Sequence, residues 1–185
     1  MAESMFVDED RPKGTATGTP LRLAVGGDHA GFLLKSPVIQ LLQAWGHTVE
    51  DFGTHSVEPV DFPDIAHRVC EAVRGGRADR GVLVCGTGVG ACIAANKHPG
   101  IRAAVAHDVY SAHQCVEHDD VNVLCVGAQI VGHKLVGDIL RAYVDARFVA
   151  DEQFVRRLAK LRDLEAQEAR GLAARPPSPR TSGGS

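Results

Sequence analysis

A cysteine followed by alternating glycines is the segment of this sequence best suited to chemistry. An apolar run ends in Cys85, and the positions that follow include Gly86, Gly88 and Gly90. Glycines let the backbone turn tightly, which leaves main-chain N–H groups exposed at the start of a helix expected near Ala91. Such a turn can hold an oxyanion or a phosphate. A thiol beside these donors indicates acid–base or nucleophilic chemistry on a substrate that develops negative charge.

Three other strand-like runs also end in polar residues. They are the run 21–25, followed by Asp28 and His29, the run 101–106, followed by His107 and Asp108, and the run 122–126, followed by Gln129. In sheets of parallel strands, ligands bind beyond the carboxyl ends of the strands. We therefore expect a functional site where these side chains meet Cys85.

The strand-like runs alternate with helical segments along the chain. The expected strands are 21–25, 48–52, 82–85, 101–106 and 122–126. Helices follow them, one ended by Gly46, one ended by Gly75, and others over 91–97, 108–117, 134–146 and 151–169. This alternation predicts an α/β fold, a three-layer Rossmann-like five-stranded parallel sheet with helices on both faces.

Composition favours one globular domain over residues 21–168. The chain has 185 residues, of which 44% are hydrophobic and 23% charged, enough for a sizeable core. Residues 1–20 lack periodicity and carry an acidic cluster, and residues 169–185 are rich in glycine, proline and serine. Both ends are expected to be disordered extensions.

Several classes of function are disfavoured by the same composition. A formal net charge of −3 and an aromatic content of 5% argue against nucleic acid or an anionic membrane as partner. No apolar run approaches the ~20 residues that span a bilayer, and no signal-peptide core is present, so we expect a cytoplasmic protein. The five cysteines form no C-x-x-C pair, which argues against a disulfide framework.

No metal or cofactor site is expected. His107, His113 and His118 lie close in sequence, but their spacing does not place them on one helix face, so structural or surface roles are expected for His107 and His113. The glycine spacing after Cys85 does not match a dinucleotide-binding fingerprint, and it follows the third strand instead of the first.

Four ordered motifs resemble the type B ribose-5-phosphate isomerase and galactose-6-phosphate isomerase family. They are Gly-Asp-His-Ala-Gly-Phe at 27–32, Asp-Phe-Pro-Asp at 61–64, Cys-Gly-Thr-Gly-Val-Gly at 85–90 and Gly-Ile-Arg-Ala-Ala at 100–104. The resemblance covers about residues 21–165. It implies an aldose–ketose isomerase that works through an enediolate without a metal. It also implies a homodimer or homotetramer with shared sites, in which the last helix packs on a partner subunit.

The resemblance further implies roles for individual residues. Cys85 would be the base that moves the proton between C1 and C2, and Thr87 would assist at the hydroxyl. Asp28 and His118 would handle ring opening. The main-chain amides that would hold the enediolate oxygen are those of Gly86, Gly88, Val89 and Gly90. The other substrate-binding residues would be His29, Asp61, Asp119, Gln129 and Arg157. A helix N-terminus near Cys85 is expected to lower the pKa of its thiol.

Three positions depart from the pattern of that family. Asp119 stands where the family has asparagine, and Gln129 and Gln153 stand where it has arginines that hold phosphate; Arg157 is kept. Loss of a guanidinium removes a charge and a bidentate donor. The first hypothesis is an isomerase of the ribose 5-phosphate/ribulose 5-phosphate type. The alternatives are an isomerase of a tetrulose phosphate, a branched sugar or a sugar without phosphate, and a non-catalytic sugar-binding sensor.

Overall fold

The computed structural model describes residues 19–173, so the predicted extension before residue 19 and the tail after residue 173 lie outside the described part. Two compact units divide the chain, one ending at Val149 and the other beginning at Ala150. This boundary falls inside the predicted domain of residues 21–168. The residues between the last two helices, 146–151, form neither helix nor strand.

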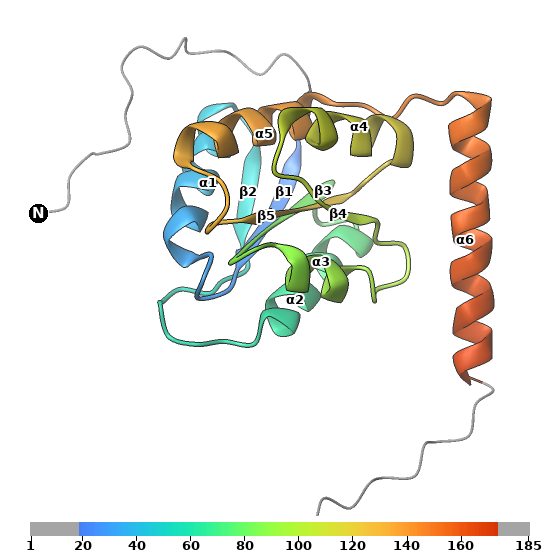
Figure 1. The fold of residues 1–185 in the computed structure, drawn as a ribbon, viewed down its shortest axis with the longest axis horizontal. Helices are drawn as coiled ribbons and strands as arrows, with labels where there is room; N and C mark the ends of the chain where they lie inside the picture. The colour runs from blue at the N-terminus through green and yellow to red at the C-terminus, as the bar shows by residue number, and fades with distance from the viewer. Residues whose placement is uncertain (1–18, 174–185) are drawn as a thin grey trace, which may run out of the picture. The chain divides into compact units, whose positions relative to one another are not determined.

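The first unit is built on one sheet of five parallel strands (Figure 1). The strands are β1 (Arg22–Gly27), β2 (Thr48–Asp51), β3 (Arg80–Cys85), β4 (Ala103–Val105) and β5 (Val123–Gly127). Their order across the sheet is β2-β1-β3-β5-β4, and all neighbours pair in parallel. Strand β5 is fully buried and β3 is buried except at Arg80, as expected when helices cover both faces.

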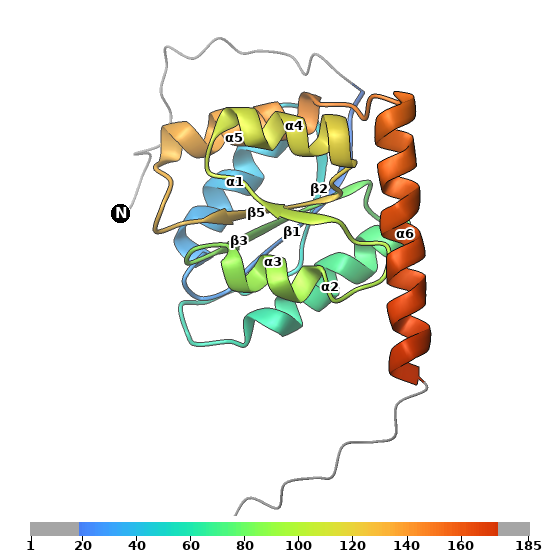
Figure 2. The same ribbon diagram turned by 45° about the vertical axis from the view of Figure 1, so that its right-hand side comes forward.

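Helices cover both faces of this sheet (Figure 2). One face carries α1 (Phe32–Ala44), α4 (Val109–Asp119) and α5 (His133–Asp145), and the other carries α2 (Phe62–Arg74) and α3 (Val89–Ala95). The three-layer α/β architecture predicted from the alternating pattern is confirmed.

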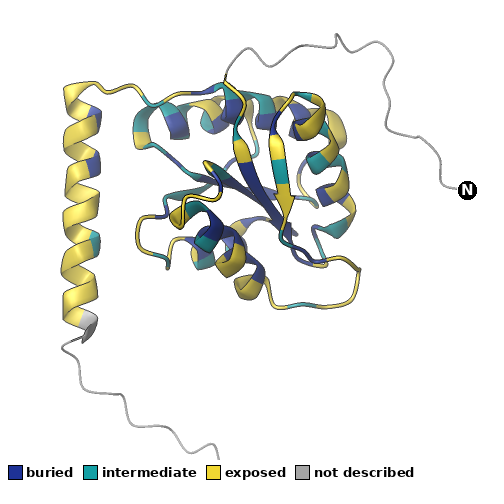
Figure 3. Ribbon diagram, turned by 180° about the vertical axis from the view of Figure 1, so that it is seen from behind, coloured by how far each residue is buried: buried dark blue, intermediate teal, exposed yellow. Residues whose placement is uncertain are grey.

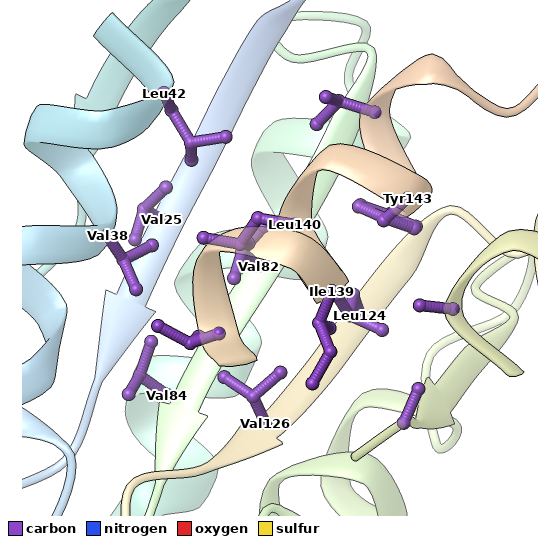
Figure 4. Close-up of a cluster of buried hydrophobic side chains, with 14 of the residues drawn as sticks. Val25, Val38, Leu42, Val82, Val84, Leu124, Val126, Ile139, Leu140 and Tyr143 are labelled. Atoms are coloured by element: carbon purple, nitrogen blue, oxygen red, sulfur yellow. The ribbon is translucent and has the colours of Figure 1, made fainter. Parts of the chain in front are cut away.

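The larger of the two core clusters lies between the sheet and α1, α4 and α5 (Figure 4). Its strand residues include Val25, Val82, Val84, Leu124 and Val126, which pack against Val38, Leu42, Ile139, Leu140 and Tyr143. Each of these side chains is at most 1% exposed. Full burial of one such aliphatic side chain stabilises the fold by about 1.5–3 kcal/mol, so this layer fixes the strands that carry the site.

The edge strand β4 is shorter than the predicted strand 101–106. Side-chain amides accept the backbone N–H groups at its start: Asn122 Oδ1 accepts from Arg102 at 2.8 Å, and Asn96 Oδ1 accepts from Ala103 at 2.9 Å. These side chains take the place of a strand partner, so regular pairing is confined to three residues. Strand β1, by contrast, extends two residues beyond the predicted end at Val25.

The second unit contains α6 (Glu152–Ala173), a helix whose surface is mostly exposed (Figure 3). The helix continues beyond residue 168, where the sequence placed the start of an irregular tail. Its exposed apolar residues include Val155, Leu161 and Leu164, each about half exposed. Among the described residues, no helix combines the length and apolar character that a membrane span requires.

Candidate active site

The Cys85 thiol and the Asp28 carboxylate form a buried pair where β1 and β3 end. Cys85 is the last residue of β3, and Asp28 follows β1, which pairs with β3. The thiol donates a hydrogen bond to Asp28 Oδ2 at 2.8 Å. The other carboxylate oxygen accepts from the backbone N–H of Gly31 at 2.9 Å. Because Asp28 is only 5% exposed, its carboxylate is held in place and directed at the sulfur.

The environment of Cys85 raises the pKa of its thiol. Burial is the largest cause, and the hydrogen bond to Asp28 and the negative charge of that carboxylate raise the pKa further. Hydrogen bonds from the backbone of Gly88 and Gly86 act in the opposite direction but are outweighed. The start of α3 therefore acts in the expected direction through Gly88, but the net shift is the opposite of the expected one, because burial and the Asp28 carboxylate outweigh it.

The glycine turn after Cys85 needs its glycines at specific positions. Gly88 has φ +79°, a left-handed conformation that glycine adopts readily, and it comes directly before α3. A Cβ at Gly31, on the facing turn, would lie 1.9 Å from the carbonyl oxygen of Val84. The two turns thus approach each other closely, which brings Asp28 to Cys85. Thr87 is exposed between the glycines, and its hydroxyl lies 3.4 Å from the N–H of Val89.

His29 and Asp61 lie beside this pair at the same edge of the sheet. His29 Nδ1 accepts a hydrogen bond from the backbone N–H of Val60 at 3.3 Å, so its exposed Nε2 carries the proton in the neutral ring. The next residue, Asp61, is exposed at the start of α2. Phe62 then packs its ring over Gly90, where a Cβ would be 3.1 Å from the ring. The starts of α2 and α3 are therefore in contact.

The end of β5 closes the other side of the glycine turn. The N–H groups of Ala128 and Gln129 donate to the carbonyls of Cys85 and Gly86, at 2.8 and 3.0 Å. The Gln129 side chain folds back over the turn, because its Oε1 lies 3.3 Å from where a Gly86 Cβ would be. Gln129 is exposed. The Gln129 amide is thus next to the glycine turn.

His107 lies at this edge, as expected from its place after the run 101–106, although only a structural or surface role was expected for it. Its Nε2 accepts a hydrogen bond from the backbone N–H of Gly127 at 3.0 Å. Gly127 is the register partner of Cys85 in the β3–β5 pairing. The position of His107 directly after a predicted strand was the available signal.

Three predicted site residues are not brought to Cys85 by the first unit. His118 and Asp119 are in the last turn of α4, which leads back to the amino end of β5. The carbonyl of Asp119 accepts from Arg102, just before β4. At about 3.3 Å per residue, the length of β5 separates this edge from Cys85 by roughly 15 Å. The third residue, Arg157, belongs to the second unit and is exposed on α6.

The described residues include no group of three or more histidine, cysteine, aspartate or glutamate side chains arranged to hold a metal ion. The five cysteines are all free. What the carboxyl edge does provide is a thiol, a carboxylate, a hydroxyl and main-chain amides within one turn region. These groups can move protons and bind a developing negative charge.

Polar groups that gather beyond the carboxyl ends of the strands of a parallel α/β sheet are typical of proteins that bind small polar ligands. Residues 23–161 match the ribose/galactose isomerase family, and the chain belongs to that family. The predicted family and the predicted isomerase class are thereby confirmed.

Named relatives agree with this membership. Ribose-5-phosphate isomerase B of Escherichia coli is 46% identical over 127 residues, covering 69% of this chain and 85% of the relative. D-erythrulose-4-phosphate isomerase of Pectobacterium atrosepticum is 40% identical over 132 residues, with the same coverage of 69% and 85%. The structure of ribose-5-phosphate isomerase B from Clostridium thermocellum superposes with a TM-score of 0.78 at 42% identity, covering 80% of this chain and 99% of that one.

Proposed function

We propose that this isomerase interconverts the aldose and ketose forms of a small sugar phosphate, with Cys85 as the group that moves the proton between C1 and C2. The observation that carries the proposal is the 2.8 Å hydrogen bond from the Cys85 thiol to the buried Asp28 carboxylate, at the mouth of the glycine turn. A thiol with a raised pKa is a poor base unless its own proton can leave. Asp28 is placed to accept that proton.

The pair works as a proton relay in this proposal. Sulfur takes the proton from the substrate carbon next to the carbonyl while the thiol proton passes to Asp28 Oδ2, so the net charge of the pair and substrate is unchanged. The electron pair of the broken C–H bond forms the enediolate, whose oxygen the amides of the glycine turn would hold. Reversal onto the neighbouring carbon completes the isomerisation, and Thr87 would pass the proton between the two hydroxyl oxygens.

This role differs from the ring-opening role that the resemblance implied for Asp28. Both oxygens of its carboxylate already have donors, Cys85 and Gly31, and little of the side chain is exposed. We therefore assign ring opening to His118, with the exposed His29 as the second candidate at that step.

We further propose that each site is completed by a second copy of the chain. His118 and Asp119 lie at the far edge of their own sheet, and Arg157 lies on a helix of a separate unit. The exposed apolar residues of α6 suit a helix that packs on a partner subunit, as the resemblance implied. The homodimer or homotetramer and the cytoplasmic location stay predictions.

Ribose 5-phosphate and ribulose 5-phosphate are the first substrates that we propose. A four-carbon tetrulose phosphate is the second, because Gln129 folds over Gly86 and replaces a longer, charged side chain. One relative carries the name of an isomerase of each kind. A non-catalytic sugar-binding sensor would bind these sugars without turnover. We prefer the isomerase because a sensor has no need of a thiol hydrogen-bonded to a buried carboxylate.

The proposal is tested with Cys85→Ala and purified full-length protein. Exchange of a C1 proton of ribulose 5-phosphate and of erythrulose 4-phosphate with solvent deuterium, followed by NMR, should fall by about 10³-fold or more, because a general base is lost. Circular dichroism and the oligomeric state should be unchanged. Exchange that continues at the wild-type rate in this variant would overturn the role of Cys85.

A further inference from the structure

We infer that His107 is a positioning residue of the active site, which holds residues 127–129 against the glycine turn and so sets how tightly substrate binds. This inference rests on the proposed function. It concerns a histidine that the proposed mechanism does not use and that lies behind the reacting groups, on the edge-strand side of β5.

The hydrogen bond between Gly127 and His107 takes the place of a backbone hydrogen bond between β5 and β4. Along the β4–β5 pairing, backbone groups serve as partners: Val123 N–H donates to the carbonyl of Arg102, and Ala106 N–H donates to the carbonyl of Cys125. Regular pairing ends at Val105, opposite Cys125. The next N–H on β5 that faces the edge is that of Gly127, and it meets the imidazole of His107 in place of a carbonyl.

The chemistry of this contact fixes the state of the ring. A backbone N–H only donates, so His107 Nε2 must present its lone pair, and the neutral ring carries its proton on Nδ1. Gly127 is buried. A side chain without an acceptor at this position would leave its N–H unsatisfied, which is costly in the interior.

Residues 127–129 connect His107 to the reacting loop by direct contacts. A Cβ on Gly127 would lie 2.9 Å from the Cα of Thr87, so the two backbones already touch. The next two residues donate to the carbonyls of Cys85 and Gly86. A shift of Gly127 toward the edge therefore moves Thr87 and the Gln129 side chain, which face the substrate in the proposed site.

The Cys85–Asp28 pair itself is anchored differently. Asp28 is held by Gly31, and its N–H donates to the carbonyl of Val84 at 3.2 Å, so β1 and β3 hold the carboxylate of the proton relay without β5. The backbone of Cys85 also contacts β5 through Ala128, but its thiol is oriented by the hydrogen bond to Asp28. Loss of the His107 hydrogen bond should for this reason weaken substrate binding more than proton transfer.

Two substitutions separate positioning from simple stability. His107→Leu keeps an apolar side chain of similar size but removes the acceptor, whereas His107→Gln can place an amide oxygen near the former Nε2. With ribose 5-phosphate, His107→Leu should raise KM about 10-fold while kcat changes less than about threefold, as expected for misplacement of binding groups. His107→Gln should restore KM to within about twofold of the wild type, because its amide oxygen can accept the same N–H. His113→Leu, at an exposed histidine of α4 that pairs with Glu117, is the matched control and should leave KM unchanged.

An amide signal provides a readout that does not depend on turnover. The ¹H shift of the Gly127 amide should move upfield in His107→Leu and return in His107→Gln. If wild-type protein turns over no sugar phosphate, the proposed function fails, and the Gly127 signal together with NMR titration of ribose 5-phosphate still tests His107. An unchanged KM or dissociation constant in His107→Leu, or equal impairment of both variants, would overturn the inference.

Discussion

The two edges of the sheet differ in how completely one chain builds them. At the carboxyl edge, Cys85 and Asp28 are buried, hydrogen-bonded to each other and fixed by backbone contacts. At the amino edge, His118 is partly exposed, and Asp119 is exposed. The proposed proton-transfer groups are thus preorganised within a single chain, whereas His118 and Asp119 lie at the opposite edge, where the proposed function requires a second copy.

This difference follows from chain connectivity. The turns after β1, β3 and β5 all emerge at one edge, so short local segments bring their residues together. Helix α4 returns the chain to the opposite edge before β5 begins, and it carries His118 with it. Residues in neighbouring turns can therefore form a tight site within one chain, whereas His118, at the end of α4, is carried away from it.

The largest expected effect comes from substituting Asp28 at the carboxyl edge of the sheet. Asp28→Asn keeps the shape but cannot take the thiol proton, so kcat should fall by about 10²-fold or more. The carboxylate raises the pKa of Cys85, so its removal should lower that pKa and speed the reaction of Cys85 with iodoacetamide at neutral pH. Turnover and alkylation should therefore change in opposite directions, as measured by coupled assay and peptide mass spectrometry. A loss of activity with unchanged Cys85 reactivity would contradict the relay.

The comparison of the two edges is tested by mixing inactive variants. Cys85→Ala and His118→Ala, refolded together, should regain about a quarter of wild-type activity, because half of the dimers are mixed and each has one intact site. Cys85→Ala mixed with Asp28→Asn is the matched control, and it should regain nothing, since both changes lie at the same edge of the chain. Recovery in the control, or none in the first mixture, would mean that sites are not shared in this way.

Substitutions at the proposed phosphate-binding positions should have a smaller effect. Gln129→Arg combined with Gln153→Arg introduces two guanidinium groups where the resemblance implied phosphate-binding arginines, and KM for ribose 5-phosphate should fall by about 10-fold, since charged bidentate donors bind phosphate well. Gln40→Arg with Gln43→Arg adds the same charge at exposed positions of α1 and serves as the control. An unchanged KM in the first variant would indicate that phosphate is bound elsewhere.

The sequence was sufficient for the fold and for the residues at the carboxyl edge. Apolar runs alternating with helical periodicity located all five strands, and the polar residues after them identified Asp28, Cys85 and Gln129 as neighbours. The reason is general, because parallel strands place their following turns at one edge.

The pKa of Cys85 and the side-chain hydrogen bonds of the site could not be predicted from the sequence. The raised pKa of Cys85 depends on the direction of the Asp28 carboxylate and on burial, neither of which spacing reveals. The proposed role of His107 depends on the end of regular β4–β5 pairing at Val105, after which the Gly127 N–H meets the imidazole. Local patterns predict which elements form, but not which polar groups meet after they pack.

The smallest expected effect is a difference in alkylation rate between two thiols, that of Cys92 and that of the proposed base Cys85. Hydrogen bonding from Cys125 lowers the pKa of Cys92 to about 7, and the Asn96 amide, 3.5 Å from the sulfur, contributes. Cys92 is partly exposed, whereas the pKa of Cys85 is raised. At pH 7, iodoacetamide should therefore modify Cys92 several-fold faster than Cys85, with a rate that rises through a midpoint near pH 7, since the thiolate is the nucleophile. Cys125→Ala should move that midpoint upward, and peptide mass spectrometry follows both sites. If Cys85 were alkylated first in the wild type, its thiol would already be ionised at neutral pH, and Asp28 would not be needed as proton acceptor.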